Sequence, residues 1–313
     1  MRLSLVATLY NSAPHLLEFY ERMTQCAQQI THDYEIILVN DGSPDSSLDL
    51  ALKLFEQDTR VKVIDLSRNF GHHKAMMTGL EHAQGEYVFL IDSDLEEPPE
   101  TLKLFWDELQ KAHDLDVVFG VQEKRKGGWF ERVSGVLYYK IMNWLGEVKI
   151  PKNLLTVRLM SRHYTQNLIR YQEREMEFGV LTELVGFRKK SVVVQKSSSS
   201  PTSYSMVKKF SLLVNGVTSS TNRPLWLIFY LGLGITLGSL AYVVWLIINR
   251  VIYGSQVVEG WTSVIVSIFF FGGLIIFVLG IIGIYLSKIF IESKRRPYTV
   301  IRKIYESGRN DDR

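Results

Sequence analysis

Two long uncharged stretches in the last third of the chain constrain the fold more than any other feature. Leu225–Ile248 contains 24 residues and Trp261–Leu286 contains 26, and neither includes a charged side chain. At a rise of about 1.5 Å per residue, a helix of either length can cross a hydrocarbon core of about 30 Å. Helices of soluble proteins normally alternate an apolar with a polar face. The sequence therefore predicts a two-helix transmembrane anchor.

The charges around these stretches predict which side of the membrane the rest of the chain occupies. The connection 249–260 carries a single cation, Arg250, and an acidic Glu259. Many more cations flank the two helices on their outer sides, so the positive-inside rule places both ends of the chain in the cytoplasm. The predicted organisation is a cytoplasmic domain over 1–204, a juxtamembrane amphipathic segment over 205–223, an anchor over 224–286 with spans 225–248 and 261–286, and a basic cytoplasmic tail over 287–313.

The first 120 residues alternate short apolar runs with amphipathic, helix-like patterns. Such alternation with short loops is typical of the α/β class, with a mostly parallel, doubly wound sheet. Strands are predicted at Leu3–Leu9, Tyr34–Val39, Val61–Leu66, Tyr87–Ile91 and Val117–Val121, and helices at Ala13–Gln29, Ser46–Gln57, His72–Ala83 and Pro99–Lys111.

The strand Tyr87–Ile91 is followed directly by acidic residues. Its five consecutive apolar residues indicate a strand buried on both faces, and ligands of parallel sheets gather at the carboxyl ends of such strands. Asp92, Asp94 and Glu96 supply oxygen donors at this position, which favours Mg²⁺ or Mn²⁺. An isolated Asp-x-Asp is more often a solvated loop or helix cap, so the other strand ends decide between the two interpretations.

Two other predicted strands end in polar residues as well. Asp41 and Gly42 follow the second strand, and the donor-rich segment Ser67–Gly71 leads from the third strand into a helix N-terminus, a favourable position for an anion. A plain turn with a helix cap is the alternative for Asp41. His72 and His73 lack the spacing of a metal site, and we assign them no metal role.

Composition excludes some classes of protein. The net charge of +3 is too small to indicate nucleic-acid binding, and the single cysteine, Cys26, excludes an internal disulfide and suits a reducing compartment. The apolar run at the N-terminus is too short for a signal peptide and is predicted to be the first strand.

Four motifs in this order give the chain a resemblance to a known family: Tyr10-Asn11, Asn40-Asp41-Gly42-Ser43, Arg68-Asn69-Phe70-Gly71-His72 and Asp92-Ser93-Asp94-Leu95-Glu96-Glu97-Pro98-Pro99-Glu100. The chain resembles glycosyltransferase family 2. Within it, the chain looks like the polyprenyl-phosphate glycosyltransferases with two C-terminal spans, which include bactoprenol glucosyltransferases, the undecaprenyl-phosphate aminoarabinose transferase and, more distantly, dolichyl-phosphate mannose synthase. The resemblance extends to Arg158-Leu159-Met160 and to Gly283-x-Tyr285.

The resemblance implies a GT-A fold in the bacterial inner (plasma) membrane. It implies inverting, metal-dependent transfer of a sugar from a nucleotide-sugar donor to polyprenyl phosphate, with undecaprenyl phosphate as the expected acceptor. The product would be a polyprenyl-monophosphate sugar for cell-envelope modification. Relatives can be tetramers, so a homo-oligomer is also expected. By this comparison the nucleotide would be held by Thr8, Tyr10, Asn11, Asp41, Ser67, Asn69, Gly71, Asp92 and Ser93, and the metal by Asp92, Asp94 and Glu96.

The acceptor side of the reaction needs positioning rather than a base. A phosphate monoester has a second pKa of about 6, so its oxygen is largely ionised at neutral pH. The residues expected to bind this phosphate or the lipid surface are Lys124, Arg125, Lys126, Arg158, Lys208 and Lys209. We assign catalytic roles to Asp94, Arg125 and Arg158. A solvated basic loop is the alternative for residues 124–126.

Departures from the family pattern leave two rival functions open. Thr156 stands where many relatives have Asp, and residues 195–204 replace a Gly-Glu-Ser-Lys-Tyr segment. These changes suggest a catalytically silent scaffold that binds a nucleotide-sugar or assists a flippase. A processive polysaccharide synthase is the second rival, but Gln172–Glu175 lacks the tryptophan of that class's Gln-x-x-Arg-Trp motif, and two spans make a poor channel.

Overall fold

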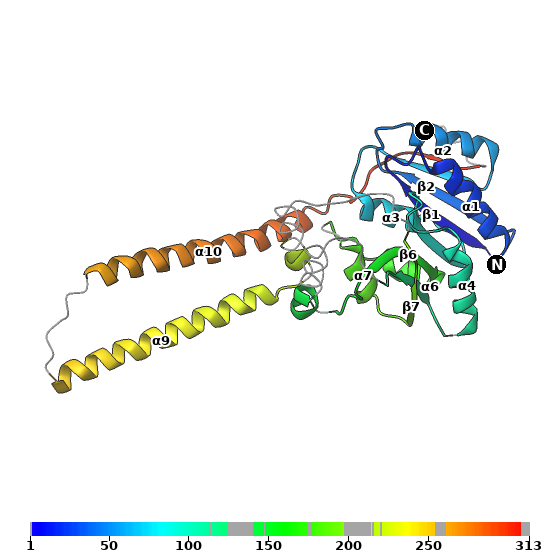
Figure 1. Cartoon of the computed structure of the whole chain (residues 1–313). Helices are drawn as coiled ribbons and strands as arrows, with labels where there is room; N and C mark the ends of the chain where they lie inside the picture. Colours follow the sequence, from blue (N-terminus) through cyan, green and yellow to red (C-terminus); the bar gives the residue numbers. More distant parts are fainter. Residues whose placement is uncertain are drawn as a thin grey trace.

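The structure is a computed structural model in which an α/β domain carries two long projecting helices (Figure 1). It describes residues 2–112, 114–123, 140–146, 148–174, 177–196, 214, 216–219, 221–253 and 261–307.

One eight-stranded sheet forms the centre of the domain, with the order β7-β5-β6-β4-β1-β2-β3-β8. Strands β6 and β8 run antiparallel to their neighbours, and the other pairings are parallel. The mostly parallel α/β sheet expected from the sequence is confirmed. The strands are β1 (Leu3–Leu9), β2 (Tyr34–Asn40), β3 (Val61–Leu66), β4 (Tyr87–Asp92), β5 (Val117–Val121), β6 (Leu154–Ser161), β7 (Lys189–Val193) and β8 (Ile301–Tyr305).

Helices cover both faces of the sheet, which explains why β1, β2 and β3 are buried along their whole length. The first face packs against α1 (Leu16–Gln28), α2 (Ser47–Gln57) and α4 (Thr101–Lys111). The second face packs against α3 (His72–Glu81), α6 (Arg162–Leu168) and α7 (Phe178–Leu184).

The predicted elements of the first 120 residues are all present, with small differences at their ends. Helices α1 and α4 each start later than predicted, because the chain first makes a tight turn: His15 N–H donates to the Ser12 carbonyl, and Thr101 N–H to the Pro98 carbonyl, each at 3.0 Å. Strand β4 is one residue longer than predicted and includes Asp92. That residue's position is therefore fixed by the sheet rather than by a loop.

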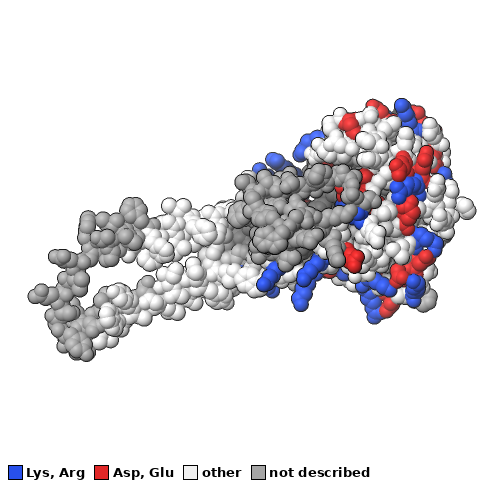
Figure 2. Space-filling view, in the orientation of Figure 1, with Lys and Arg blue, Asp and Glu red and all other residues white. Residues whose placement is uncertain are grey.

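The two apolar stretches form α9 (Arg223–Tyr253) and α10 (Trp261–Ser293), which extend from the domain in the same direction (Figure 1). Within the described residues, one segment, Phe270–Ser293, is long and apolar enough to cross a membrane, and apart from Tyr285 none of it is buried inside the protein. In α9, the described apolar segment Arg223–Ile235 is shorter than Phe270–Ser293. Lys and Arg side chains gather where the helices meet the domain (Figure 2).

The C-terminal segment differs from the expected basic tail over 287–313. Helix α10 continues to Ser293, and Ile301–Tyr305 forms β8, which pairs with β3 at the edge of the sheet. Pairing satisfies the backbone groups that β3 would otherwise expose. Tyr305 also packs near Phe55, with 6.2 Å between ring centroids. The α/β domain is therefore built from the first 200 residues together with β8.

Candidate active site

The polar residues at the strand ends lie together at the carboxyl edge of the sheet. Thr8 on β1 is in register with Val39 on β2 and with Asp92 on β4. The next pair along, Leu9 and Asn40, brings Asn40 into register with Asp65 on β3. Three motifs that are far apart in the sequence thus meet at one edge, as the sequence predicts.

Asp92 lies in a small polar cluster with two neighbouring elements. The Nε2 atom of His72, at the start of α3, lies 3.1 Å from Oδ1 of Asp92, and Nδ1 of the same ring lies 3.1 Å from the Thr8 hydroxyl. Burial alone would raise the pKa of Asp92, but the His72 imidazolium and the nearby Thr156 and Lys196 outweigh burial and lower it. Burial likewise opposes charge on His72, but the surrounding carboxylates, Asp92 first, raise its pKa. Asp92 is therefore ionised at neutral pH.

One oxygen of this carboxylate makes no hydrogen bond among the described residues. Oδ1 of Asp92 is buried, and its one ion-pair contact in the described part of the chain is with Nε2 of His72. Asp94, two residues on, is exposed, and its Oδ1 accepts from the Glu96 N–H at 2.9 Å. Burial and the carboxylates of Asp92 and Glu96 raise the pKa of Asp94.

These carboxylates fit a hard divalent cation in part. The orphaned oxygen of Asp92 and the exposed carboxylate of Asp94 are suitable ligands for Mg²⁺ or Mn²⁺, which commonly take further ligands from phosphate and water. Glu96 instead binds Lys196, with 2.6 Å between Oε2 and Nζ. In the described part of the chain, no three acidic, His or Cys side chains converge as a complete metal site.

Asp41 holds the loop that follows β3. Its two carboxylate oxygens accept hydrogen bonds from the N–H groups of Phe70 (2.7 Å) and Gly71 (3.0 Å). Burial raises the pKa of Asp41, although these two donors oppose the shift. Gly42 adopts a φ of +60°, and a Cβ atom there would lie 2.5 Å from the backbone nitrogen of Asn69. The lack of a side chain at Gly42 therefore allows the loop after β3 to approach the turn after β2 closely.

The turn after β1 is tied to the turn after β2. The Ser93 hydroxyl donates to the Thr8 carbonyl at 2.7 Å and also lies 2.8 Å from the Ser12 hydroxyl. The Asn11 N–H donates to the Ser43 hydroxyl at 2.8 Å, and Asn11 itself has a φ of +54°. Tyr10 is about half exposed at this edge, with 52 % of its surface accessible. An aromatic side chain in this position can stack on a ligand.

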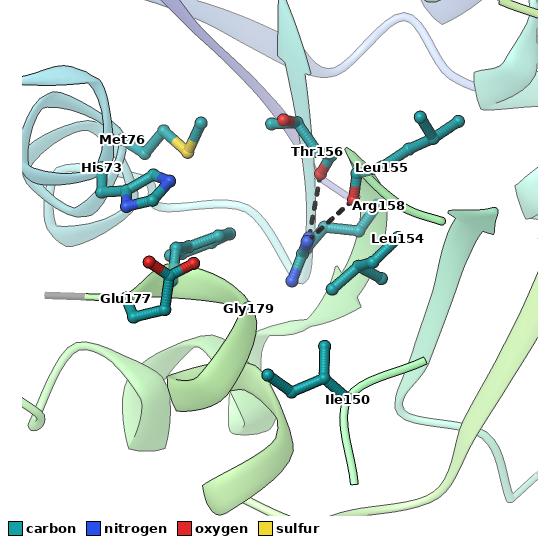
Figure 3. A pocket seen from close by; sticks show the side chains of 10 residues that line it. His73, Met76, Ile150, Leu154, Leu155, Thr156, Arg158, Glu177 and Gly179 are labelled. Carbon is teal, nitrogen blue, oxygen red and sulfur yellow. Dashed lines mark hydrogen bonds between the residues drawn. The ribbon is translucent and has the colours of Figure 1, made fainter. Parts of the chain in front are cut away.

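A pocket of about 140 Å³ is lined by Arg158 of β6 and by Thr156, whose side chain also interacts with Asp92 (Figure 3). The Arg158 guanidinium donates to the carbonyls of Thr156 (2.9 Å) and Leu155 (3.1 Å), with its carbon 4.5 Å from the centre of the Phe178 ring. His73 and Glu177 line the opposite side. Arg158 is only 2 % exposed, burial lowers its pKa, and it forms no ion pair with any described carboxylate. A buried, unpaired guanidinium is well suited to bind an anion.

Glu97 holds β6 in place beneath this pocket. Its Oε2 accepts from the Val157 N–H at 2.9 Å and its Oε1 from the Thr156 N–H at 3.2 Å. Burial, together with the charge of Asp92, raises the pKa of Glu97 to about 7. Glu97 therefore positions the strand segment that carries both Thr156 and Arg158.

The structure brings together many of the predicted residues. Those at the sheet edge are Thr8, Tyr10, Asn11, Asp41, Ser67, Asn69, Gly71, Asp92, Ser93, Asp94 and Glu96, with Arg158 in the adjoining pocket. The predicted cations Lys124, Arg125, Lys126, Lys208 and Lys209 lie outside the described residues.

Sequence reasoning missed four participants. They are His72, Glu97, Lys196 and Arg302. His72 is the last residue of a motif that the sequence analysis singled out, so its position was available as a signal. Nothing in the sequence pairs Lys196 or Arg302 with residues a hundred or more positions away.

Comparison with known proteins decides the family. The model of glycosyl transferase family 2 matches residues 4–176, more than half of the chain. The chain belongs to this family. This transferase is 48 % identical to a putative glycosyltransferase of Mycobacterium tuberculosis. The alignment covers 98 % of this chain and 89 % of the relative. The bactoprenol glucosyl transferase of Shigella phage SfV is 30 % identical, and the alignment covers 96 % of this chain and 98 % of the relative. A prophage bactoprenol glucosyl transferase homolog from Escherichia coli is 29 % identical, with 97 % of this chain and 99 % of the relative covered.

Proposed function

We propose that this family 2 glycosyltransferase transfers a sugar from a nucleotide-sugar to a membrane polyprenyl phosphate, with inversion at the anomeric carbon. The observation that carries the proposal is the proximity of two carboxylates to a buried guanidinium. Asp92 and Asp94 lie near a pocket lined by Arg158, which forms no ion pair among the described residues. Relatives of about 30 % identity are named bactoprenol glucosyl transferases, which supports the acceptor class.

The donor would lie at the carboxyl edge of the sheet, where Tyr10, Asn69 and Asp92 face one region. Asp92 and Asp94 would hold Mg²⁺ or Mn²⁺, which when bound neutralises charge on the donor diphosphate. The His72 imidazolium holds Asp92 ionised, so the carboxylate is ready for the cation at neutral pH. These residues therefore favour departure of the nucleoside diphosphate.

The acceptor phosphate would lie in the Arg158 pocket, with the first apolar part of the lipid along Ile150, Leu154 and Phe178. An ionised phosphate oxygen attacks the anomeric carbon and forms the new C–O bond. The bond from that carbon to the diphosphate breaks, and its electron pair leaves with the nucleoside diphosphate. No proton has to be removed from the attacking oxygen, so Thr156 in place of a carboxylate is compatible with this step.

Helices α9 and α10 would form a two-span anchor in the bacterial plasma membrane. The pairing of β8 with β3 supports this proposal, because it returns the chain to the sheet from which it left. If α10 crosses the membrane, α9 must cross it too. The cations at the domain end of the helices would then lie at the cytoplasmic surface.

Turnover by the purified full-length chain tests the proposal. The protein in detergent is incubated with undecaprenyl phosphate, MnCl₂ or MgCl₂ and a panel of nucleotide-sugars, and lipid products are identified by mass spectrometry. We expect one donor to give a lipid-monophosphate sugar that disappears when EDTA is added. Asp94→Ala should lower the rate by at least about 100-fold, in line with the loss of a metal-held charge in the transition state.

A matched control separates loss of the site from loss of charge. Asp107 is an exposed carboxylate on α4 that pairs with Lys103, and Asp107→Ala should leave the rate unchanged. Arg158→Lys should raise the KM for undecaprenyl phosphate by about tenfold, because an ammonium group cannot keep both carbonyl contacts and bind the anion. Nucleotide binding without any lipid product from any donor would instead favour the silent scaffold.

A further inference from the structure

The segment after the membrane helices contacts the loop that is expected to bind the donor. The Ser67 N–H donates to the Val300 carbonyl at 2.9 Å, and the Ser67 carbonyl accepts from Nη2 of Arg302 at 2.8 Å. Both backbone groups of the first loop residue are thus held by the C-terminal segment. The loop's far end, at Phe70 and Gly71, is held by Asp41.

The same arginine reaches a buried network under the sheet edge. Nη1 of Arg302 lies 3.3 Å from Oδ2 of Asp65, whose other oxygen accepts from the side-chain amide of Asn40 at 2.8 Å. The Asn40 amide oxygen in turn accepts from the Ser43 N–H at 3.2 Å. The side chain of Asp65 is 3 % exposed, so these partners take the place of water around its carboxylate. One guanidinium therefore joins the loop after β3 to the turn after β2.

Contacts on both sides fix the position of this segment. The Tyr298 hydroxyl donates to Glu81 at 2.8 Å, the hydroxyls of Thr299 and Thr78 lie 2.9 Å apart, and Nζ of Lys62 lies 2.6 Å from Glu306. These contacts involve α3 and β3, the two elements that the loop Ser67–Gly71 connects. They hold the strand independently of the Arg302 side chain.

We propose that β8 is part of the donor site and that Arg302 is a positioning residue, which sets the Ser67–Gly71 loop for the nucleoside diphosphate. This inference rests on the proposed donor site at the sheet edge, but not on the identity of the acceptor. Because Arg302 bonds the loop from outside, it would act on donor affinity through the Ser67 carbonyl and Asp65. The membrane anchor and the donor site are thereby linked through seven residues, 294–300.

Nucleotide binding by the full-length chain tests the role of Arg302. UDP, GDP and dTDP, each with Mn²⁺, are titrated into the detergent-purified protein by calorimetry. For the nucleotide that binds, Arg302→Ala should raise the Kd about five- to tenfold, through loss of two hydrogen bonds from a charged donor. Arg302→Lys should have an intermediate Kd, because one ammonium group cannot satisfy both acceptors in the same geometry.

Lys303→Ala is the matched control, since Lys303 is an exposed cation on the same strand whose contact is with the Tyr305 ring. Its Kd should equal that of the wild type. The thermal midpoint of Arg302→Ala should stay within about 2 °C of the wild type, because the backbone pairing of β8 is retained.

Three results would overturn the inference. They are an unchanged Kd in Arg302→Ala, a rise in Kd shared equally by Lys303→Ala, and the absence of any nucleotide binding to the wild type. The proposed transferase function fails differently, by nucleotide binding without a lipid-linked product.

Discussion

Asp45 illustrates how single residues shape the edge of the sheet. Its carboxylate accepts from the Ala13 N–H (3.0 Å), the Ser47 N–H (3.1 Å) and the hydroxyls of Ser43 and Ser47, both at 2.5 Å. Burial opposes ionisation, but these four donors outweigh it and lower the pKa of Asp45 to about 2. Asp45 therefore ties the turns after β1 and β2 together only in its charged form.

Because this pKa is depressed in the folded state, Asp45 contributes stability above the ordinary aspartate pKa of about 4 and loses it as the pH falls toward 2. We expect Asp45→Asn to lower the thermal midpoint at pH 6 and to have a shrinking effect between pH 4 and pH 2. Differential scanning fluorimetry of both proteins across this range measures the difference. A constant difference at all pH values would contradict this account.

Glu97 likewise holds a neighbouring segment in place, next to the Arg158 pocket. Its carboxylate accepts hydrogen bonds from the backbone N–H groups of Thr156 and Val157. In Glu97→Gln, one carboxylate oxygen becomes an amide NH₂ that faces either the Thr156 or the Val157 N–H. We expect the free energy of unfolding to fall by about 1–3 kcal/mol, since a buried donor loses its acceptor. Turnover should fall as well, because β6 carries Arg158.

Glu100→Gln provides the comparison for that variant. Glu100, the residue before α4, forms a solvent-accessible ion pair with Arg22 at 2.8 Å. Exposed pairs contribute about 0–1 kcal/mol, so Glu100→Gln should keep nearly full stability and activity. Equal losses in the two variants would show that Glu97 has no special positioning role.

At the scale of elements, the position of α3 depends on close packing at Gly79. A Cβ atom at this position would lie 2.5 Å from Cγ1 of Val6 and 3.0 Å from Cγ2 of Val39. Helix α3 can therefore lie directly on β1 and β2. This approach places His72, at the other end of the helix, against Asp92 and Thr8.

Gly79→Ala has two opposing effects on the stability of the folded protein, and both have known sizes. Helix propensity favours alanine by about 1 kcal/mol, whereas overpacking a core costs about 1–3 kcal/mol. We expect net destabilisation, measured as a lower thermal midpoint. The double variant Val6→Ala/Gly79→Ala should lose less than the sum of the two single variants, because the space left at Val6 accepts the new methyl group. Additive losses would show that Val6 is not the obstacle.

Some elements could be predicted from the sequence and others could not, for physical reasons. Strands β1 to β4 were predictable, because burial on both faces favours predominantly apolar runs such as Tyr87–Ile91. Strand β8 was not, since its charged residues Arg302 and Lys303 are typical of a solvated tail. Its stability depends on the edge of β3, more than two hundred residues away in the chain.

The candidate site shows the same division. Asp92 and Asp41 were predictable as carboxylates at strand ends. The partners that set their charge and geometry, His72 and the backbone of Phe70 and Gly71, depend on how α3 and its loop pack against the sheet. The sequence therefore identified the carboxylates of the candidate site. It did not identify the residues that contact each of them.

At the scale of the whole molecule, the pairing of β8 with β3 returns the chain to the domain after α9 and α10, so the proposed anchor would cross the membrane an even number of times. Reporter cysteines at Glu56 on α2 and at Ser307 after β8 lie on exposed positions of the domain. In intact spheroplasts, an impermeant maleimide should label neither, while a cysteine replacing Ser255 between α9 and α10 should be labelled. Lysis should make the first two reactive. Labelling of Ser307→Cys in intact cells would contradict the paired β3–β8 arrangement.

The pairing of β3 with β8 also determines the order in which the protein matures. Strand β3 is synthesised early, but its partner leaves the ribosome only after both apolar helices have been made. Until then the edge of β3 and the loop that follows it lack their last support. The sheet of the domain is therefore complete only after α9 and α10 have been synthesised, and until then the Ser67–Gly71 loop lacks its contacts with Val300 and Arg302.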